Sequence, residues 1–347
     1  MNSNWTENND FIPPWYLKSG HLQTLLTGFY KPKVAITPDV THKIPIGNLG
    51  EMLVHENSPG NLFGDDKAVF LLHGLGSCHR GTYMSRIAAN LLASGFRVFR
   101  FDLPGAGDSY LHTPLPPHGA CYELVWQSLL FLSEKCGIRR WRGAGVSLGG
   151  NILLKLTSAH ADDLTDSNNA PFCIDRSVAV APPIDLSACC QNMERGFNAI
   201  YAKYFLRSLK RQTLSRAKLW PQWRDVLPGA SFKTIREFDN TVTSVLAGFH
   251  SAEHYYEFGS SKNDLSKIVT KTWLLLDKDD PIVPISIFED APYSSSTTVV
   301  TTKKGGHVGY LARIDQARAS QLERDVSKKK HFRWADEWIS QQLIEDF

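Results

Sequence analysis

The sequence predicts an α/β fold, with a mostly parallel central sheet and helices on both of its faces. Two observations lead to this prediction. Short apolar segments of strand length alternate with longer segments of helical periodicity through most of the 347 residues. Several short segments, such as residues 68–72, are apolar almost without interruption, which is typical of strands that are buried on both faces. With 42% hydrophobic residues, the chain can build the large core that such a sheet needs.

The order of the elements supports this fold class. The first two strands have no helix between them, so we expect them to form an antiparallel edge of the sheet. Residues 1–12 are polar and are expected to be disordered, whereas residues 11–30 mix Pro, Trp, Tyr and Leu and are expected to wrap against the body. The expected strands are residues 41–46, 51–56, 68–72, 97–101, 141–146, 177–180, 272–276 and 297–301, and the expected helices are residues 83–93, 122–135, 151–159 and 333–344.

Residues from about 185 to 265 interrupt the alternation with a long, mostly helical block rich in aromatic and basic residues. The block falls between the expected strands 177–180 and 272–276. Open α/β sheets bind their ligands at the carboxyl ends of the strands, and an insertion at this point would cover that edge. We therefore interpret the block as a lid within a single domain that spans residues 1–347. The alternative is an ordinary set of packing helices with a solvated basic face.

Composition excludes several classes of function. The net charge of +3 is mild and gives no argument for binding to nucleic acid. None of the six cysteines lies in a Cys-x-x-Cys pair, so we expect reduced thiols, no metal site and a cytoplasmic location. The amino-terminal residues have no features of a secretory signal, and no uncharged stretch approaches the ~18 apolar residues of a membrane span. An integral membrane segment is excluded, while peripheral membrane contact stays open.

A Gly-x-Ser-x-Gly motif at residues 145–149 is the strongest chemical signal. It follows an expected strand and precedes an expected helix, a context in which the serine sits on a sharp turn with its hydroxyl exposed. The first backbone N–H groups of the following helix then point to the same place and can stabilise an oxyanion. Ser147 is therefore the candidate nucleophile, and it needs a neighbouring base.

His307 is the candidate base. It lies in Gly-Gly-His-Val-Gly at residues 305–309, a glycine-rich loop after the last expected strand. Such a loop can bring an imidazole over the serine. Most of the other histidines either precede the serine or, like His331, lie near the start of the last expected helix.

Asp280 is the candidate acid that orients the imidazole. It precedes Pro-Ile-Val-Pro at residues 281–284, whose two prolines fix φ and provide a rigid mount. Asp279 is the alternative. The chain order Ser147, Asp280, His307 differs from the orders found in the chymotrypsin and subtilisin folds.

The segment 73–76, His-Gly-Leu-Gly, ends the strand 68–72 and can supply a second oxyanion donor. We expect the backbone N–H groups of Leu75 and Leu148 to form the oxyanion hole, with His73 as a structural residue. The glycine-rich segment 101–109 lacks the spacing of a phosphate loop, and we interpret it as a structural turn. Cys78 is either a reactive thiol or, in the simpler interpretation, a buried bystander.

Together these segments resemble the α/β-hydrolase superfamily. More closely, the chain is similar to the YheT-like hydrolases, bacterial relatives of eukaryotic acylglycerol and phospholipid lipases and of yeast ethanol acyltransferases. His-Leu-Gln-Thr at 21–24 and Arg-Glu-Phe-Asp at 236–239 are its specific pieces. The resemblance implies that Ser147, Asp280 and His307 form the catalytic triad. The matching segments run over nearly the whole chain, at residues 14–24, 73–77, 100–109, 145–151, 236–239, 280–281 and 305–309.

The sequence thus predicts a serine hydrolase that cleaves small-molecule carboxylic acyl esters and needs no metal or cofactor. Two alternatives remain open at this point. The same residues serve an acyltransferase that passes the acyl group to an alcohol, and a catalytically inactive hydrolase fold can serve as a binding protein. Unlike the membrane-bound eukaryotic relatives, the chain is expected to carry no amino-terminal anchor.

Overall fold

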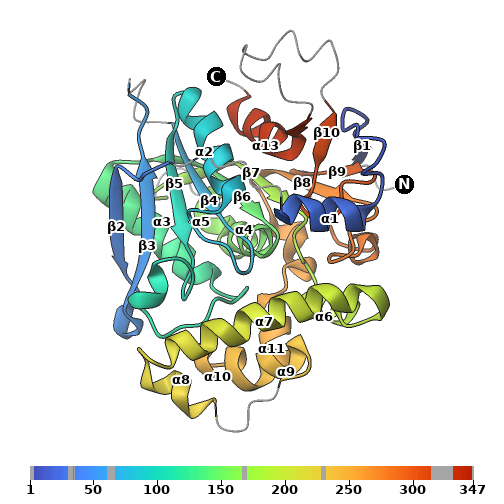
Figure 1. Cartoon of the computed structure of the whole chain (residues 1–347). Helices are drawn as coiled ribbons and strands as arrows, with labels where there is room; N and C mark the ends of the chain where they lie inside the picture. Colours follow the sequence, from blue (N-terminus) through green and yellow to red (C-terminus); the bar gives the residue numbers. More distant parts are fainter. Residues whose placement is uncertain are drawn as a thin grey trace.

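A nine-stranded sheet forms the centre of the molecule in the computed structural model (Figure 1). The structure describes residues 4–29, 34, 36–60, 67–165, 170–227, 232–313 and 331–345. The strand order is β1-β9-β8-β7-β6-β4-β5-β3-β2. The strands are β1 (Trp5–Glu7), β2 (Val40–Pro45), β3 (Glu51–Asn57), β4 (Ala68–Leu72), β5 (Arg97–Asp102), β6 (Arg140–Val146), β7 (Cys173–Val180), β8 (Lys271–Asp277) and β9 (Thr297–Thr302).

The pairing of the strands confirms the predicted fold class. Every neighbouring pair from β5 across to β1 is parallel, whereas β2 pairs antiparallel with β3 and β3 with β5. The expected antiparallel edge is therefore present. Strands β5 and β6 lie on opposite sides of β4, so the order of the strands reverses there, and such a reversal opens a crevice at the carboxyl ends.

Helices cover both faces of the sheet, and alternate residues of β4 show why. Phe70 and Leu72 pack into the core beneath α3 (Tyr122–Cys136) and α4 (Leu148–Ala159). Val69 and Leu71 point the other way, into the core beneath α2 (Thr82–Ala93) and α13 (Trp334–Ile344). A strand buried on both faces needs apolar side chains at every position, which accounts for the uninterrupted apolar segment.

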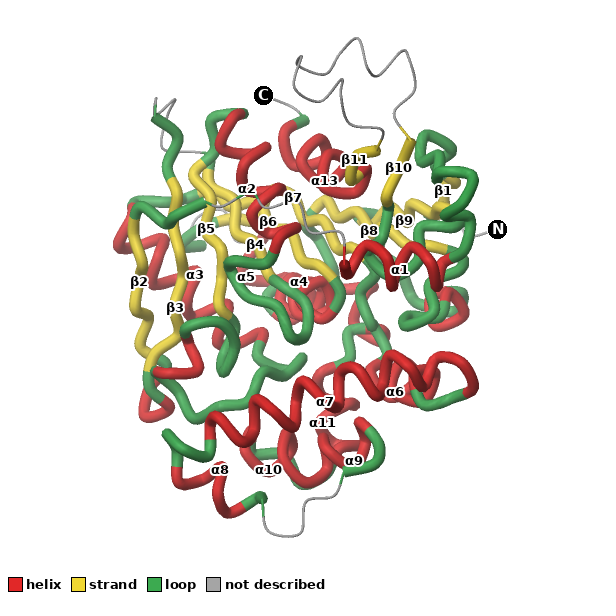
Figure 2. Tube along the Cα trace, viewed as in Figure 1, coloured by secondary structure: helices red, strands yellow, loops and turns green. Residues whose placement is uncertain are grey.

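A group of helices lies together at the lower edge of the sheet in Figures 1 and 2. These helices occupy the block that the sequence singled out at residues 185–265. They have a small apolar core of their own, which includes Leu206, Trp223 and Phe238. The helices are α6 (Leu186–Met193), α7 (Ala199–Arg216), α8 (Pro221–Asp225), α9 (Ile235–Phe238), α10 (Ser244–Ala247) and α11 (Ala252–Gly259), with a π-helical segment at Asp239–Thr243.

The amino-terminal segment differs from the prediction. Residues 1–12 were expected to be disordered, but Trp5–Glu7 forms β1, in parallel register with Val299–Thr301 of β9. The Asn4 side chain donates to the carbonyls of Ser294 and Thr297, both at 2.8 Å. The prediction for these residues was wrong because their order comes from pairing with an edge strand about 290 residues away, which local polarity cannot reveal. Residues 1–3 lie outside the described residues.

The expected packing of the segment that begins at residue 11 is present, since Phe11 and Leu17 are buried against the body. Two elements near the chain ends were not predicted, and the first is the helix α1 (Gly20–Phe29) within this segment. His331 does not begin the last helix, because His331–Arg333 forms β11, which pairs antiparallel with β10 (Leu311–Arg313).

Candidate active site

Ser147 occupies a sharp turn between β6 and α4. Its φ of 53° is in the left-handed region, which costs energy in a residue with a side chain. The two motif glycines allow this turn to pack. A Cβ atom at Gly145 would lie 2.3 Å from the carbonyl oxygen of Gly149, and one at Gly149 would lie 2.4 Å from that of Leu72. The serine is thus held by close backbone packing against β4, as the motif predicts.

His307 connects Ser147 to an acid. Its Nε2 atom lies 2.9 Å from the Ser147 Oγ, and its Nδ1 atom lies 2.8 Å from Oδ2 of Asp280. The other carboxylate oxygen of Asp280 accepts from the backbone N–H groups of Ile282 and Val283, at 2.8 and 2.9 Å. Five residues from three separate loops thus form one continuous series of hydrogen bonds.

Asp279, the alternative acid, points elsewhere. Its Oδ2 accepts from the backbone N–H of Gly20, at 2.8 Å, at the start of α1. The two neighbouring carboxylates therefore have separate contacts. Asp280 faces the imidazole, and Asp279 holds the first turn of α1.

Helix α1 fixes the loop that carries His307, a role that the sequence analysis did not identify. The hydroxyl of Thr24 accepts from the backbone N–H of His307, at 2.8 Å, and donates to the carbonyl of Gly20, at 2.7 Å. The fully buried Gln23 accepts from the N–H of Leu311 and donates to its carbonyl. These residues belong to His-Leu-Gln-Thr at 21–24, so the family-specific motif was the signal that could have found them.

Asp277 holds the other end of the same loop. Its carboxylate accepts from the N–H groups of Gly305, at 2.7 Å, and Gly306, at 3.2 Å, and from the hydroxyl of Thr302. Burial raises the pKa of Asp277 above its usual range, and the neighbouring Asp279 carboxylate raises it further.

The two expected oxyanion donors lie beside the serine. Leu148 is the first residue of α4, and Leu75 follows Gly74, where an added Cβ would be 3.2 Å from the Ser147 Cβ. Leu75 and Leu148 both line the same pocket as Ser147. His73 is buried, with Nδ1 2.8 Å from the Gly74 carbonyl and Nε2 accepting from the N–H of Leu103. Burial lowers the pKa of His73, and its two hydrogen bonds brace the loop.

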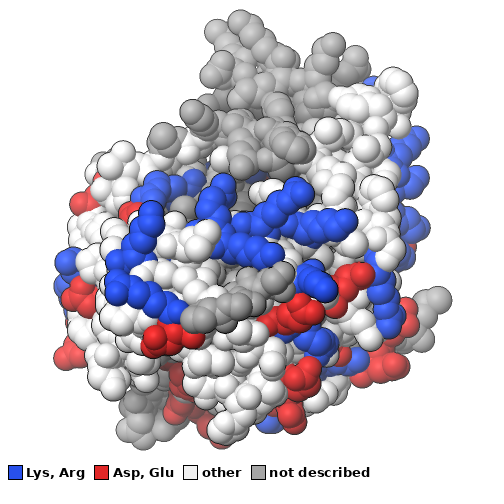
Figure 3. Space-filling model, turned by 60° about the horizontal axis from the view of Figure 1, so that its bottom comes forward, with Lys and Arg blue, Asp and Glu red and all other residues white. Residues whose placement is uncertain are grey.

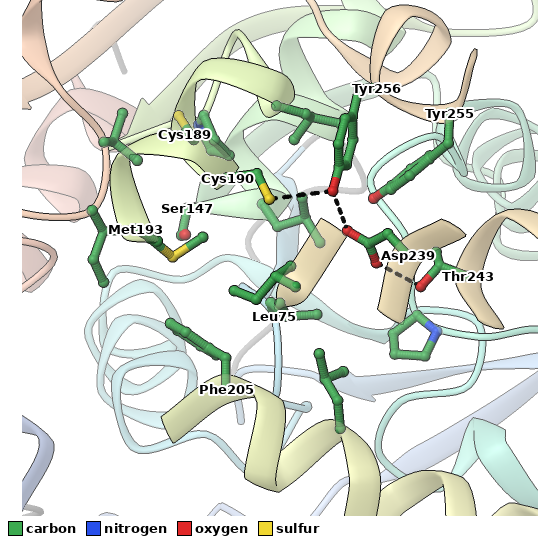
Figure 4. A pocket seen from close by; sticks show the side chains of 18 of the residues that line it. Leu75, Ser147, Cys189, Cys190, Met193, Phe205, Asp239, Thr243, Tyr255 and Tyr256 are labelled. Carbon is green, nitrogen blue, oxygen red and sulfur yellow. Dashed lines mark hydrogen bonds between the residues drawn. The ribbon is translucent and has the colours of Figure 1, made fainter. Parts of the chain in front are cut away.

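An apolar pocket extends from Ser147 into the helical block (Figure 4). Polar groups appear at its far side, where Asp239 accepts from the hydroxyls of Tyr256 and Thr243, both at 2.7 Å. Burial raises the pKa of Asp239 to about 6. Residues of the pocket wall include Leu75, Pro183, Leu186, Met193, Phe205, Leu209, Ile235, Tyr255 and Val283.

The cysteines near the site are poor nucleophiles. Burial raises the pKa of Cys190 to about 12, and it raises that of Cys189 well above its usual range. Burial also raises the pKa of Cys78, beside the loop of Leu75. Because the thiolate is the reactive form, these side chains line the site without competing with Ser147.

Two groups of side chains in the described part of the chain bring potential metal ligands within 4.8 Å of one another. In the first, His55, His79 and Asp108 surround Asp102, whose oxygens already accept four hydrogen bonds. The second consists of His42, Glu56 and Cys136, where the His42 imidazole is bonded to Glu56. The geometry of both is that of hydrogen-bonded networks, and neither group includes a residue of the Ser147 site. Among the helices of the described residues, none is long and apolar enough to cross a membrane.

Comparisons with known proteins identify the family to which this fold belongs. The profile of the alpha/beta hydrolase family matches residues 69–319. The chain is 27% identical over 313 residues to the protein named "Putative esterase YheT" of Escherichia coli (strain K12), which is 88% of each chain. It is 23% identical over 321 residues to phospholipase ABHD3 of Homo sapiens, which is 90% of this chain and 76% of that protein.

Solved structures show the same fold. The 2,6-dihydroxy-pseudo-oxynicotine hydrolase superposes with a TM-score of 0.54 at 16% identity, over 93% of this chain and 72% of that one. The Pyrococcus furiosus esterase Pf2001 superposes with a TM-score of 0.51 at 16% identity, over 90% of this chain and 97% of that one. The family profile covers more than half of the sequence, and we conclude that this chain belongs to the alpha/beta hydrolase family.

Proposed function

We propose that this hydrolase cleaves carboxylic acyl esters through an acyl-enzyme on Ser147. The observation that carries the proposal is the series of hydrogen bonds from Asp280 through His307 to Ser147, which ends at the wall of an apolar pocket. A serine hydroxyl becomes a nucleophile when an oriented imidazole accepts its proton. Esterase and lipase names among the relatives support the same class of substrate.

In the first half of the proposed reaction, the Ser147 Oγ attacks the ester carbonyl carbon while His307 Nε2 accepts the hydroxyl proton. The N–H groups of Leu75 and Leu148 stabilise the oxyanion. When the tetrahedral intermediate collapses, the bond to the leaving alcohol breaks and His307 gives the alcohol its proton. Asp280 accepts from the Nδ1–H of His307 throughout, which keeps Nε2 free to act as the base.

Water completes the cycle. His307 takes a proton from a water molecule that attacks the acyl-serine, and the collapse of the second intermediate releases the carboxylic acid and restores Ser147. The apolar side chains of the helical block, Met193, Phe205 and Leu209 among them, are suited to hold the acyl chain, and we propose that this block acts as the lid of the site. The six unpaired cysteines fit a reducing compartment, for which we propose the cytoplasm.

The test is hydrolysis of p-nitrophenyl butyrate by the wild type and by Ser147→Ala. We expect the substitution to lower kcat by at least about 10³-fold. Ser215→Ala, which removes an exposed hydroxyl of α7, is the matched control and should retain full activity. A fluorophosphonate probe should label Ser147, and peptide mass spectrometry locates the label. An unlabelled, inactive wild type would instead indicate a binding protein built on a hydrolase fold.

Transfer to an alcohol is the second candidate, because the pocket wall is mostly apolar and disfavours water beside the acyl-serine. Product analysis in the presence of ethanol separates the two reactions. An ethyl ester that increases with ethanol concentration indicates acyl transfer, whereas carboxylic acid alone at every ethanol concentration rules it out.

A further inference from the structure

The segment from residue 195 to residue 224 is strongly one-sided in charge. It carries eight Lys and Arg residues and no Asp or Glu, in a chain whose overall totals of 38 basic and 35 acidic residues nearly balance. Helix α7 makes up most of this segment. A basic helix without acidic residues is typical of a surface that binds an anionic partner. The eight residues are Arg195, Lys203, Arg207, Lys210, Arg211, Arg216, Lys218 and Arg224.

The outward side of α7 combines these charges with exposed apolar side chains. Phe197, just before the helix, is 65% exposed and Tyr204 is 69% exposed. Both fall on a stripe of exposed residues that are three or four positions apart and therefore share one side of the helix. This surface, here called the α7 face, consists of Phe197, Ile200, Lys203, Tyr204, Arg207, Arg211 and Leu214, all exposed.

The charges of the α7 face are uncompensated within the described residues. The side chains of Lys203, Arg207 and Arg211 have neither a hydrogen bond nor an ion pair there, whereas the buried Arg216 turns inward to the carbonyl of Gly105 and lies over the ring of Trp223. Figure 3 brings this side of the molecule forward: Lys and Arg gather across its middle, and Asp and Glu lie mostly below and beside them. The face thus presents free positive charge to a partner.

The helix that carries the α7 face also lines the candidate active site. On its inner side, α7 contributes Phe205 to a groove that also contains Ser147, His307 and Thr24 of α1. Helix α1 is joined to α7 by His21, whose Nδ1 atom lies 2.9 Å from the Tyr201 hydroxyl. Helix α1 itself carries two exposed apolar residues, Leu22 and Leu26.

We propose that the α7 face docks the protein on an anionic lipid surface. Basic side chains are attracted to anionic headgroups, aromatic rings such as Tyr204 favour the interfacial region, and aliphatic side chains such as Ile200 insert below it. A second copy of the chain fits this face poorly, because a twofold interface would bring the same positive charges together. A surface that binds nucleic acid would need the basic and aromatic side chains, but it would have no use for the exposed aliphatic side chains.

The experiment is sedimentation of the full chain with sucrose-loaded vesicles of phosphatidylcholine, with and without phosphatidylglycerol. The test variant is Lys203→Gln/Arg207→Gln/Arg211→Gln. The control variant, Lys43→Gln/Lys135→Gln/Arg139→Gln, removes the same charge from exposed positions outside the segment. Each basic residue near the surface contributes about fivefold to partitioning, so the test variant should bind anionic vesicles about 100-fold more weakly than the wild type.

The other expected results separate docking from catalysis. Wild-type binding should require phosphatidylglycerol and should weaken as salt is added. Hydrolysis of p-nitrophenyl butyrate without vesicles should be the same in the wild type and the test variant, because none of the three side chains lines the pocket. Phe197→Ser/Tyr204→Ser should weaken vesicle binding with little change in its salt dependence.

Three outcomes would overturn the proposal. The first is equal wild-type binding to neutral and anionic vesicles, and the second is an equal loss of binding in the test and control variants. The third is a test variant that binds vesicles as well as the wild type does but no longer forms a dimer, or no longer binds single-stranded RNA, where the wild type does so. The fold of each variant is checked by its urea unfolding midpoint, which exposed substitutions should leave unchanged.

Discussion

Two aspartate–histidine groups in this molecule use the same side chains in different ways. At the candidate active site, Asp280 contacts the single histidine His307, which continues to the Ser147 hydroxyl. On the other side of β4, Asp102 contacts two histidines: Nδ1 of His79 at 2.8 Å and Nε2 of His55 at 3.2 Å. Both carboxylates lie at the carboxyl ends of strands, so position in the sheet does not distinguish them.

The difference lies in where each hydrogen-bond series ends. The two imidazoles at Asp102 are stacked with ring centroids 3.5 Å apart. The series ends where His55 Nδ1 contacts the hydroxyl of Thr41. Asp102 also accepts from the backbone N–H groups of His79 and Asp108. Although burial opposes ionisation, the hydrogen bonds from His55 and His79 hold the pKa of Asp102 well below its usual range. The Asp102 group is a closed network of hydrogen bonds beside a separate surface hollow, whereas the Asp280 group ends at the Ser147 hydroxyl in an apolar pocket.

The comparison shows that an aspartate–histidine pair alone does not indicate a catalytic site. What matters is the group that the imidazole contacts next. A closed network rigidifies the fold, and removing its acid should cost stability. A network that ends at an accessible hydroxyl can pass a proton to a substrate, and removing its acid should cost rate. The substitutions below test this division, beginning with the largest expected free-energy change.

Asp280→Asn should lower kcat for p-nitrophenyl butyrate about 10⁴-fold, or roughly 5.5 kcal/mol, with little change in stability. The amide cannot hold the Nδ1–H tautomer of His307, so Nε2 is no longer free to accept the Ser147 proton. Asp279→Asn is the matched control, because that carboxylate contacts Gly20 rather than the imidazole. It should stay within about tenfold of the wild type. A larger loss in Asp279→Asn than in Asp280→Asn would reverse the assignment of the acid.

Asp102→Asn should have the opposite profile. The amide keeps only one acceptor oxygen and turns an NH2 group towards some of the donors of His55, His79 and Asp108, and we expect a loss of roughly 3 kcal/mol in the free energy of unfolding, measured with urea at neutral pH. The kcat of the folded protein should change by less than about tenfold. A stable variant with a large loss of kcat would mean that the closed network also serves the reaction.

The pH dependence of the same variant gives a second measurement. The pKa of Asp102 is lower in the folded protein than in the unfolded chain, so the unfolded chain takes up the proton first as the pH falls. The stability from Asp102 is therefore present above the ordinary aspartate range and is lost as the pH falls below about 4. Asp102→Asn should lack this acid-dependent loss.

Much of the fold and of the candidate site could be predicted because it depends on local pattern. The apolar β4 and the turn around Ser147 are encoded in a few consecutive residues, and the geometry agrees with the expected positions of His307 and Asp280. The supports of the site could not be predicted in the same way. Thr24 meets His307 across 283 positions, and residue 5 of β1 pairs with residue 299, and local sequence contains no record of such contacts.

The segment 101–109 illustrates the same limit on a smaller scale. The buried contacts of Asp102 agree with the interpretation of this segment as a structural turn. However, His55, which contacts Asp102, lies 47 positions away, and the sequence predicted only that His55 belongs to a strand. The helical block was recognised by its length. The side of α7 that lines the pocket and the side that faces outward became distinguishable only with the fold.

A third carboxylate, Asp239, extends the comparison because it is bonded to two hydroxyls and to no imidazole. Burial raises its pKa from 3.8 to about 6, so the folded protein keeps a proton that the unfolded chain releases. The free energy of unfolding contributed by this group should therefore fall as the pH rises from about 4 to 6 and level off above 6.

Asp239→Asn tests this effect. The variant should lack the pH-dependent fall, and its stability relative to the wild type should improve by roughly 2–3 kcal/mol between pH 4 and pH 7. Urea unfolding at several pH values measures the difference. Parallel stability curves for the two proteins would show that Asp239 is ionised to the same extent in the folded and unfolded states.

Thr24→Val should have the smallest effect, because Thr24 acts on His307 only through its backbone. The substitution keeps the shape of the side chain but leaves the N–H of His307 without its acceptor and the carbonyl of Gly20 without its donor. We expect kcat to fall about fivefold, or roughly 1 kcal/mol, with KM nearly unchanged, since the loop is displaced and the acyl pocket is not. Thr24→Ser should restore the rate because it restores the hydroxyl.

Thr157→Val, which removes a buried hydroxyl bonded to Leu153, should cost stability without lowering kcat. If Thr24→Val raised KM and left kcat intact, α1 would contribute to substrate binding rather than to the position of the imidazole.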